Sequence, residues 1–289
     1  MRILVTGANG RLGSELVERL RAQAHSVTGI DLDSVDITDF SHVHRVVGEL
    51  QPEVVIHCAA LTAVDYCAEH PDEALAINGF GTQSVALACQ THDAAMLYVS
   101  TNEVFDGQIF REYQEYDSPN PANAYGHSKW VGEQIVRDLV RKHYVVRTSW
   151  LFAHGGRNFI HTVLQLASQG RPIRVVINEV SSPTYCHDLA AAISQLITTG
   201  CYGFYHLVNA GHTSRYGFAR QALDLAGYAD TRVEPITLAE YRRASRPPQY
   251  TILRNVAATR LGITLRPWQE ALAAFLDAEG TLKMRTHNV

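Results

Sequence analysis

MRILVTGANGRLG, residues 1–13, decides the fold of this chain. Its apolar run Ile3–Val5 predicts a buried strand, and the helical pattern over Leu12–Leu20 predicts an amphipathic helix. Three glycines stand at the turn between strand and helix, Gly7, Gly10 and Gly13. Glycines there allow a tight turn and let backbone N–H groups at the start of a helix approach a pyrophosphate closely. The segment therefore predicts the phosphate-binding turn of a dinucleotide-binding βαβ unit.

The same alternation of apolar runs and helical patterns continues along the chain. Strands are predicted at Ser26–Ile30 and Val54–His57, with a helix near His42–Leu50 between them. Further strands are predicted at Met96–Ser100, Tyr144–Arg147, Val175–Ile177 and Tyr205–Val208. Parallel strands joined by crossover helices give an α/β fold with a doubly wound, Rossmann-like sheet. Ligands of such sheets bind at the carboxyl ends of the strands.

The regular pattern loosens after Leu151, where turn residues interrupt it. We therefore expect a dinucleotide-binding domain over residues 1–150, with a segment at about 175–205 that returns to it. Residues 151–174 and 206–289 are expected to form a smaller, interwoven C-terminal domain that binds the substrate.

Composition excludes several classes of protein. The 289 residues are 46% apolar and 19% charged, which is typical of a folded globular chain. The net charge of −4 offers no bulk attraction to nucleic acid or to an anionic membrane, so neither is expected as a partner. The five cysteines form no C-x-x-C pair, and the 14 histidines form no compact metal-binding motif, so no metal site is expected. The N-terminus does not read as a signal peptide, which favours a cytoplasmic location.

Several residues after the glycine turn are candidates for cofactor contacts. Asp31 ends the second strand about 20 residues past the glycines, where a carboxylate accepts hydrogen bonds from the adenosine ribose. A carboxylate there repels a 2′-phosphate and slightly favours NADH, whereas Arg11 partly offsets this repulsion, so NADPH and NADH both remain open. A solvated aspartate at a strand end is the alternative. Asp36 and Ile37 are expected at the adenine edge, and the small Ala59 and Ala60 let a cofactor lie against the backbone.

A second group of candidates carries acid–base chemistry. Tyr125 and Lys129 are four residues apart in a helical pattern, so they share one helix face. An ammonium beside a phenol lowers the pKa of the phenol, which makes Tyr125 a candidate proton donor. A Tyr-x-x-x-Lys pair alone is common on helices, and the glycine turn is what strengthens it. Thr101, at the end of a buried strand, supplies a hydroxyl that can polarise a substrate carbonyl.

Together these sites resemble the extended short-chain dehydrogenase/reductase superfamily and, within it, the dTDP-4-dehydrorhamnose reductase family. The resemblance spans nearly the whole chain, and its later blocks include Arg147–Trp150, Ser182–Thr184, Asp188–Leu189, Tyr205–Leu207 and Arg246–Pro247. It implies a catalytic trio of Thr101, Tyr125 and Lys129. It implies cofactor contacts at Gly7, Gly10, Arg11, Leu12, Gly13, Asp31, Asp36, Ile37, Ala59, Ala60, Tyr125 and Lys129. It implies substrate contacts at Thr101, Asn102 and Trp150.

The resemblance implies reduction, by NADPH or NADH, of the 4-keto group of a nucleotide-linked 6-deoxy sugar, with dTDP-4-dehydrorhamnose as the expected substrate. Another 4-ketosugar nucleotide is one alternative. A non-catalytic NADP-binding regulatory subunit, similar to that of methionine adenosyltransferase, is another, although the intact trio argues against it. A homodimer is possible, and Glu15 stands where some of these reductases place a Mg²⁺-linked dimer contact, but no partner ligands match it.

The sequence departs from the family at a few positions. These reductases usually carry Asp and then an aromatic residue after the threonine, whereas here Asn102 and Glu103 follow. The segment also resembles that of sugar-nucleotide 4,6-dehydratases, but Asn102 cannot donate the proton that their Asp donates, which disfavours dehydration. Asn178-Glu179 replaces a usual Asp-Gln, and Arg254 replaces a usual Asp. These changes leave the identity of the sugar open.

Overall fold

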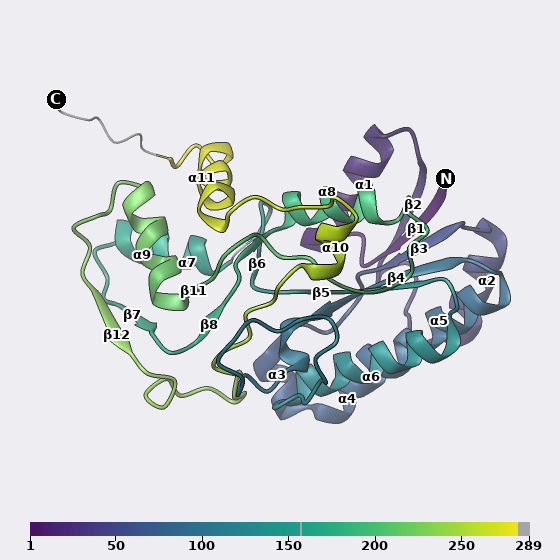
Figure 1. The fold of residues 1–289 in the computed structure, drawn as a ribbon, viewed down its shortest axis with the longest axis horizontal. Helices are drawn as coiled ribbons and strands as arrows, with labels where there is room; N and C mark the ends of the chain where they lie inside the picture. The colour runs from purple at the N-terminus through teal and green to yellow at the C-terminus, as the bar shows by residue number, and fades with distance from the viewer. Residues whose placement is uncertain (157, 283–289) are drawn as a thin grey trace.

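A six-stranded parallel sheet, covered by helices, forms the larger of two units in this chain (Figure 1). The computed structural model describes residues 1–156 and 158–282. The strands lie in the order β2-β1-β3-β4-β5-β10, and every neighbouring pair is parallel. Their bounds are β1 Arg2–Thr6, β2 Ser26–Ile30, β3 Val54–His57, β4 Ala95–Thr101, β5 His143–Thr148 and β10 Gly203–His206. The strand order reverses at β1, where a doubly wound sheet opens a crevice for a ligand.

Helices cover both faces of this sheet, which confirms the doubly wound α/β prediction. On one face α1 (Arg11–Ala22) packs against α8 (Cys186–Leu196); on the other α2 (Phe40–Leu50), α5 (Thr82–Thr91) and α6 (Ala124–Leu139) lie side by side (Figure 1). Successive strand side chains alternate between the two cores: Val5 joins the α1–α8 side and Leu4 the α2–α5 side. Both faces are apolar because both are covered.

A smaller unit lies beside the carboxyl ends of the strands (Figure 1). It contains the parallel pair β7 (Ile173–Val176) and β12 (Val233–Ile236), with α7 (Phe159–Ser168), α9 (Arg215–Leu225) and α11 (Trp268–Ala278). Phe152, Phe218 and Phe275 pack together at its centre. The predicted strand at Val175–Ile177 is thus present as β7, but it belongs to this unit and not to the main sheet, because its partner is β12.

The chain returns to the main sheet after β7. Helix α8 covers α1, and β10 then pairs with β5 as the sixth strand. Strand β10 covers Gly203–His206, whereas the predicted strand was Tyr205–Val208. Its last residue, His206, is the first residue of the second segment that we assigned to the substrate domain. The division into domains stays a prediction, and residues 283–289 of its last segment lie outside the described residues.

Short elements complete the path. They are α3 Val64–Glu69, α4 Pro71–Leu75, the π-helix η1 Ala76–Gly81, the 3₁₀-helix η2 Asn102–Val104, β6 Leu151–Phe152, β8 Val180–Ser181, β9 Thr184–Tyr185, β11 Thr213–Ser214 and α10 Val256–Arg260. Strand β6 pairs with β9, and β8 pairs with β11. Within residues 1–156 and 158–282, no helix has both the length and the apolar character needed to cross a membrane.

Candidate active site

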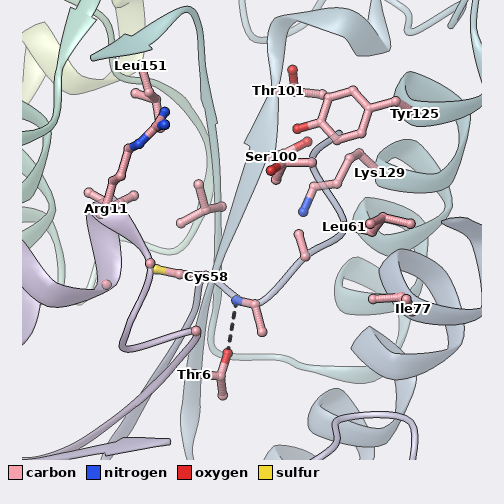
Figure 2. A pocket seen from close by; sticks show the side chains of 18 of the residues that line it. Thr6, Arg11, Cys58, Leu61, Ile77, Ser100, Thr101, Tyr125, Lys129 and Leu151 are labelled. Atoms are coloured by element: carbon pink, nitrogen blue, oxygen red, sulfur yellow. Dashed lines mark hydrogen bonds between the residues drawn. The ribbon is translucent and has the colours of Figure 1, made fainter. Parts of the chain in front are cut away.

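A cavity of about 1190 Å³ opens at the carboxyl ends of β1, β3, β4 and β5. Figure 2 shows Tyr125 and Lys129 projecting into it from α6, with Arg11 of α1 on the opposite wall. Every site residue predicted from the sequence lies in its lining: Gly7, Gly10, Arg11, Leu12, Gly13, Asp31, Asp36, Ile37, Ala59, Ala60, Thr101, Asn102, Tyr125, Lys129 and Trp150. The fold therefore brings the predicted set together around one space, while the role of each residue stays a prediction.

The glycine turn forms the floor on the α1 side. Gly7 has φ +67°, and a Cβ atom there would lie 2.7 Å from the Ala59 nitrogen. A Cβ on Gly13 would lie 2.0 Å from the Gly7 carbonyl oxygen, so only glycine lets α1 start this close to β1. Gly10 is the N-cap of α1 and has no side chain to cover the start of the helix. The positive end of the 12-residue helix supports an anion there.

Asp31 connects the end of β2 to this turn. Its Oδ2 accepts a hydrogen bond from the Asn9 N–H at 2.8 Å, and its Oδ1 accepts one from the Leu32 N–H at 2.8 Å. Each carboxylate oxygen has a second lone pair, so a ribose hydroxyl remains chemically acceptable there. Asp31 thus helps to hold the turn, and its predicted ribose contact is compatible with this geometry.

The proton-transfer candidates lie on the other side of the cavity. Asn123 caps α6 by accepting a hydrogen bond from the Gly126 N–H at 2.8 Å, which places Tyr125 in the first turn and Lys129 one turn later. Lys129 is 2% exposed, and its Nζ lies 4.1 Å from the centre of the Tyr98 ring. Burial lowers the pKa of Lys129 to about 7.

The pKa of Tyr125 is raised above its ordinary value of 10. Burial is the largest cause and the charge of Glu103 adds to it, whereas a hydrogen bond with Thr101 acts in the opposite direction. The sequence-based expectation of a lowered pKa was wrong, because burying a phenolate is costly and raises the pKa of Tyr125. Tyr125 is consequently a neutral phenol at neutral pH, and a neutral phenol has a proton to donate.

Asn102 was predicted to contact the substrate, but its side chain is occupied within the protein. Its Nδ2 donates to Thr251 Oγ1 at 2.6 Å and to Ser181 Oγ at 3.3 Å. Its Oδ1 accepts from Thr101 Oγ1 at 3.3 Å. Asn102 therefore joins the end of β4 to β8 of the smaller unit and helps to fix Thr101, while its contact with a substrate stays a prediction.

Trp150 lies beside a cation that the sequence reasoning missed. Its φ of +42° is rare for a bulky side chain, and such strain is concentrated at functional sites. The Arg215 guanidinium stacks 3.6 Å from the centre of the Trp150 ring, and Arg215 Nε donates to Glu179 Oε1 at 3.1 Å. Arg215 also lines the cavity. No spacing motif marks Arg215, since only the packing of α9 against the β5–β6 connection brings it here.

A buried ion pair beneath the site was also missed. Arg147 makes two bonds to Glu133, at 2.9 and 2.7 Å, and the two side chains are 2% and 0% exposed. Ser100 Oγ donates to Glu133 Oε1 at 2.6 Å. The pair thus links β4, β5 and α6, the elements that carry Thr101 and Tyr125.

Asn78, in the π-helix η1, positions the loop after β3. Its Oδ1 accepts from the Leu61 N–H at 2.8 Å, and its Nδ2 donates to Ser128 Oγ at 3.0 Å. This buried amide ties the loop that follows the predicted cofactor contacts Ala59 and Ala60 to the helix of Tyr125. Its position in η1 is consistent with the tendency of π-turns to occur at functional sites.

The described residues contain no group of three or more His, Cys, Asp or Glu side chains placed to hold a metal ion. Glu15, which the resemblance connected with Mg²⁺, is engaged with protein groups: its Oε1 lies 2.7 Å from His187 Nδ1 and 3.9 Å from Arg19 Nη2.

Comparisons with known proteins agree with this geometry. The model of the protein family described as "RmlD substrate binding domain" matches residues 1–280 of this chain. The chain is 38% identical to the dTDP-4-dehydrorhamnose reductase of Mycolicibacterium smegmatis, covering 94% of this chain and 84% of the relative. It is 37% identical to the spore coat polysaccharide biosynthesis protein SpsK of Bacillus subtilis, covering 96% and 97%. The chain belongs to the dTDP-4-dehydrorhamnose reductase family.

Solved structures of the family superpose closely on this chain. A dTDP-4-dehydrorhamnose reductase of Clostridium acetobutylicum gives a TM-score of 0.93 at 37% identity, covering 97% of this chain and all of the other. One from Bacillus anthracis, solved in complex with NADP, gives 0.91 at 38% identity, covering 96% and 99%. A UDP-glucose 4-epimerase of Thermotoga maritima shares the fold at 19% identity, with a TM-score of 0.84 over 97% of this chain and 99% of the other.

Proposed function

We propose that this protein uses NADPH or NADH to reduce the 4-keto group of a nucleotide-linked 6-deoxy sugar, with dTDP-4-dehydrorhamnose as substrate and dTDP-rhamnose as product. One observation carries the proposal: Thr101, Tyr125 and Lys129 line the same cavity as the glycine turn at the start of α1. A proton donor and an anion site around one space are what hydride transfer to a ketone requires. The relatives with this name cover nearly the whole chain.

The residues of the glycine turn fit a dinucleotide. The positive end of α1 suits its pyrophosphate, Asp31 its adenosine ribose, and the small Ala59 and Ala60 leave room along β3. When bound, NADPH or NADH supplies the hydride that adds to C4 of the sugar. The NADP in the Bacillus anthracis relative favours NADPH, whereas the carboxylate of Asp31 favours NADH, and both are retained.

The chain's own residues complete the reduction. The Thr101 hydroxyl, which donates to Asn102 Oδ1 in this structure, turns to donate its one proton to the C4 carbonyl oxygen and orients it. Tyr125 transfers its phenolic proton to that oxygen as the negative charge develops, so the ketone gains one hydride and one proton and becomes an alcohol. Lys129 lies one turn from Tyr125 and is placed to bind the nicotinamide ribose. Trp150 is placed to pack beside the sugar.

An activity screen tests the proposal. Purified protein is mixed with several 4-keto sugar nucleotides, each with NADPH and with NADH in parallel. The decrease in the absorbance of the reduced nicotinamide measures turnover, and the stereochemistry of the product is determined at C4. Consumption with dTDP-4-dehydrorhamnose is the expected result. Cofactor binding without consumption for every substrate favours the alternative, a regulatory subunit. The homodimer and the cytoplasmic location stay predictions that this screen does not test.

A further inference from the structure

Glu103 occupies a fixed position in the cavity wall. It follows Thr101 and Asn102 in η2 and lines the cavity. Its backbone oxygen packs against α6 so closely that a Cβ on Gly126 would lie 2.0 Å from it. Glycine at position 126 therefore lets Glu103 sit against the turn of helix that carries Tyr125, and neither residue can shift without the other.

One carboxylate oxygen of Glu103 is held and the other is not. Oε2 accepts from Asn123 Nδ2 at 2.6 Å, and the Oδ1 of the same Asn123 caps α6. Among residues 1–156 and 158–282, no donor bonds to Oε1. The hydrogen bond at Oε2 holds the half-buried carboxylate, so Oε1 stays available as an acceptor on the cavity wall.

The groups around Glu103 act on its charge and on its need for a hydrogen-bond donor. Burial, and next the charge of Glu179, raise the pKa of Glu103, whereas Asn123, Arg243 and Arg215 lower it. When a bound sugar displaces water from this half-buried carboxylate, an Oε1 without a donor costs free energy, and a ligand hydroxyl that supplies the hydrogen bond recovers it.

We propose that Glu103 determines sugar specificity by accepting a hydrogen bond from the hydroxyl on C3, the carbon beside the reacting ketone. The inference rests on the proposed function and deepens it. In a 4-keto-6-deoxy sugar, C4 has two neighbours: C3 carries a hydroxyl, and C5 carries a methyl group, which cannot donate. Because Tyr125 and Thr101 fix the C4 oxygen and Glu103 adjoins both, the C3 hydroxyl is the donor within its reach.

The assignment predicts which sugars the site rejects. A 3-deoxy sugar has no hydroxyl to donate to Oε1 and leaves this acceptor without a partner, so Glu103 disfavours 3-deoxy sugars.

The experiment compares two substrates on wild type, three Glu103 variants and one control variant. The kcat/KM for a 4-keto-6-deoxy sugar nucleotide is divided by that for its 3-deoxy analogue, with NADPH consumption as the readout. We expect wild type to prefer the hydroxyl by about 10- to 100-fold, which is typical of a hydrogen bond to a charged group. Glu103→Ala and Glu103→Phe are expected to bring this ratio close to one. Glu103→Gln, which keeps an acceptor oxygen, is expected to lie between.

The ratio separates recognition from a merely structural role. If Glu103 only positions Tyr125, its removal lowers kcat/KM for both substrates equally and the ratio stays at the wild-type value, which overturns the proposal. Glu73→Ala, which removes another carboxylate from the cavity lining, is the matched control and is expected to keep the ratio. Unchanged NADPH affinity and melting temperature show that each variant is folded.

The same experiment distinguishes a failure of the proposed reductase function from a failure of the Glu103 proposal. A folded wild-type protein that binds NADPH but consumes none with either substrate overturns the reductase and the Glu103 proposal together. Turnover of both substrates with equal kcat/KM overturns the Glu103 proposal alone and leaves the reductase standing.

Discussion

The two sides of the cavity are built differently. On the side proposed for the cofactor, β1, the start of α1 and the end of β3 all lie within the first 60 residues, and the glycine turn with Ala59 and Ala60 leaves the backbone accessible beside Arg11 and Asp31. On the substrate side, Glu103, Trp150 and Arg215 come from η2, the β5–β6 connection and the start of α9, and they present charged or aromatic side chains.

This difference reflects what each side has to recognise. A pyrophosphate is met by N–H groups that any sequence has, so the chain only needs small residues that keep the backbone accessible. A sugar is recognised by hydrogen bonds and ring contacts, which need particular side chains in particular places. The cofactor side is therefore encoded locally, and the substrate side depends on how the smaller unit packs on the sheet.

Tyr125→Phe has the largest expected effect and acts where the two sides meet. It removes the proton donor and keeps the ring, so the rate of ketone reduction is expected to fall by about 10²- to 10⁴-fold. The affinities for NADPH and for dTDP-rhamnose are expected to stay within about twofold, because binding on either side does not use the phenolic proton. Turnover and calorimetric titrations check this. Retained turnover contradicts the assignment of Tyr125 as the acid.

Gly13→Ala tests the cofactor side alone. The added Cβ would lie 2.0 Å from the Gly7 oxygen, so α1 must move away from the turn. We expect the free energy of unfolding to fall by about 1–3 kcal/mol and the NADPH dissociation constant to rise at least about tenfold. Binding of dTDP-rhamnose is expected to change little. The matched control is Gly155→Ala, since a Cβ at Gly155 meets nothing within 4 Å, although its φ of +70° carries some strain.

Arg215→Gln tests the substrate side alone. It removes the guanidinium that stacks on Trp150 and bonds to Glu179. We expect KM for the sugar nucleotide to rise about tenfold with little change in kcat, because a charged hydrogen bond and the support of the Trp150 ring are lost. The NADPH dissociation constant serves as the internal control. An unchanged KM shows that Trp150 keeps its place without the cation.

The same contrast explains what the sequence could predict. The glycine turn, the Tyr125–Lys129 spacing and Thr101 are local signals, and the fold follows from alternating strands and helices; all these residues line the cavity. Arg215 and Asn78 carry no local signal, because their contacts join segments far apart in the chain. The strand at Val175–Ile177 was assigned to the wrong sheet for a related reason: its apolar pattern predicts a strand but does not name its partner. The direction of the Tyr125 pKa shift depends on burial, which spacing alone cannot supply.

The smallest expected effect concerns Lys129 and the stability of the fold. Burial lowers its pKa to about 7 in the folded protein, whereas the unfolded chain keeps the ordinary value near 10.5. Between these two pKa values the unfolded state binds more protons, so the free energy of unfolding rises with pH. The rise is limited to about 1.4 kcal/mol per pH unit for a single proton. Denaturant unfolding at about pH 7.0 to 8.0 measures it as the difference in slope between wild type and a variant without Lys129, because the unfolded cysteines, with a pKa of about 8.5, contribute equally to both proteins.

Lys129→Met removes this titration and is expected to flatten the pH dependence. The buried groups that act electrostatically on Lys129 are Cys58 and Glu133; burial raises the pKa of Cys58 to about 12, so its thiol stays protonated throughout this interval. Lys142→Met, at an exposed lysine that pairs with Asp93, is the matched control and is expected to keep the wild-type slope. Equal slopes in wild type and Lys129→Met mean that Lys129 keeps its proton despite burial. The positive charge beside Tyr125 then persists above neutral pH, and the junction between the two sides is more polar than its burial indicates.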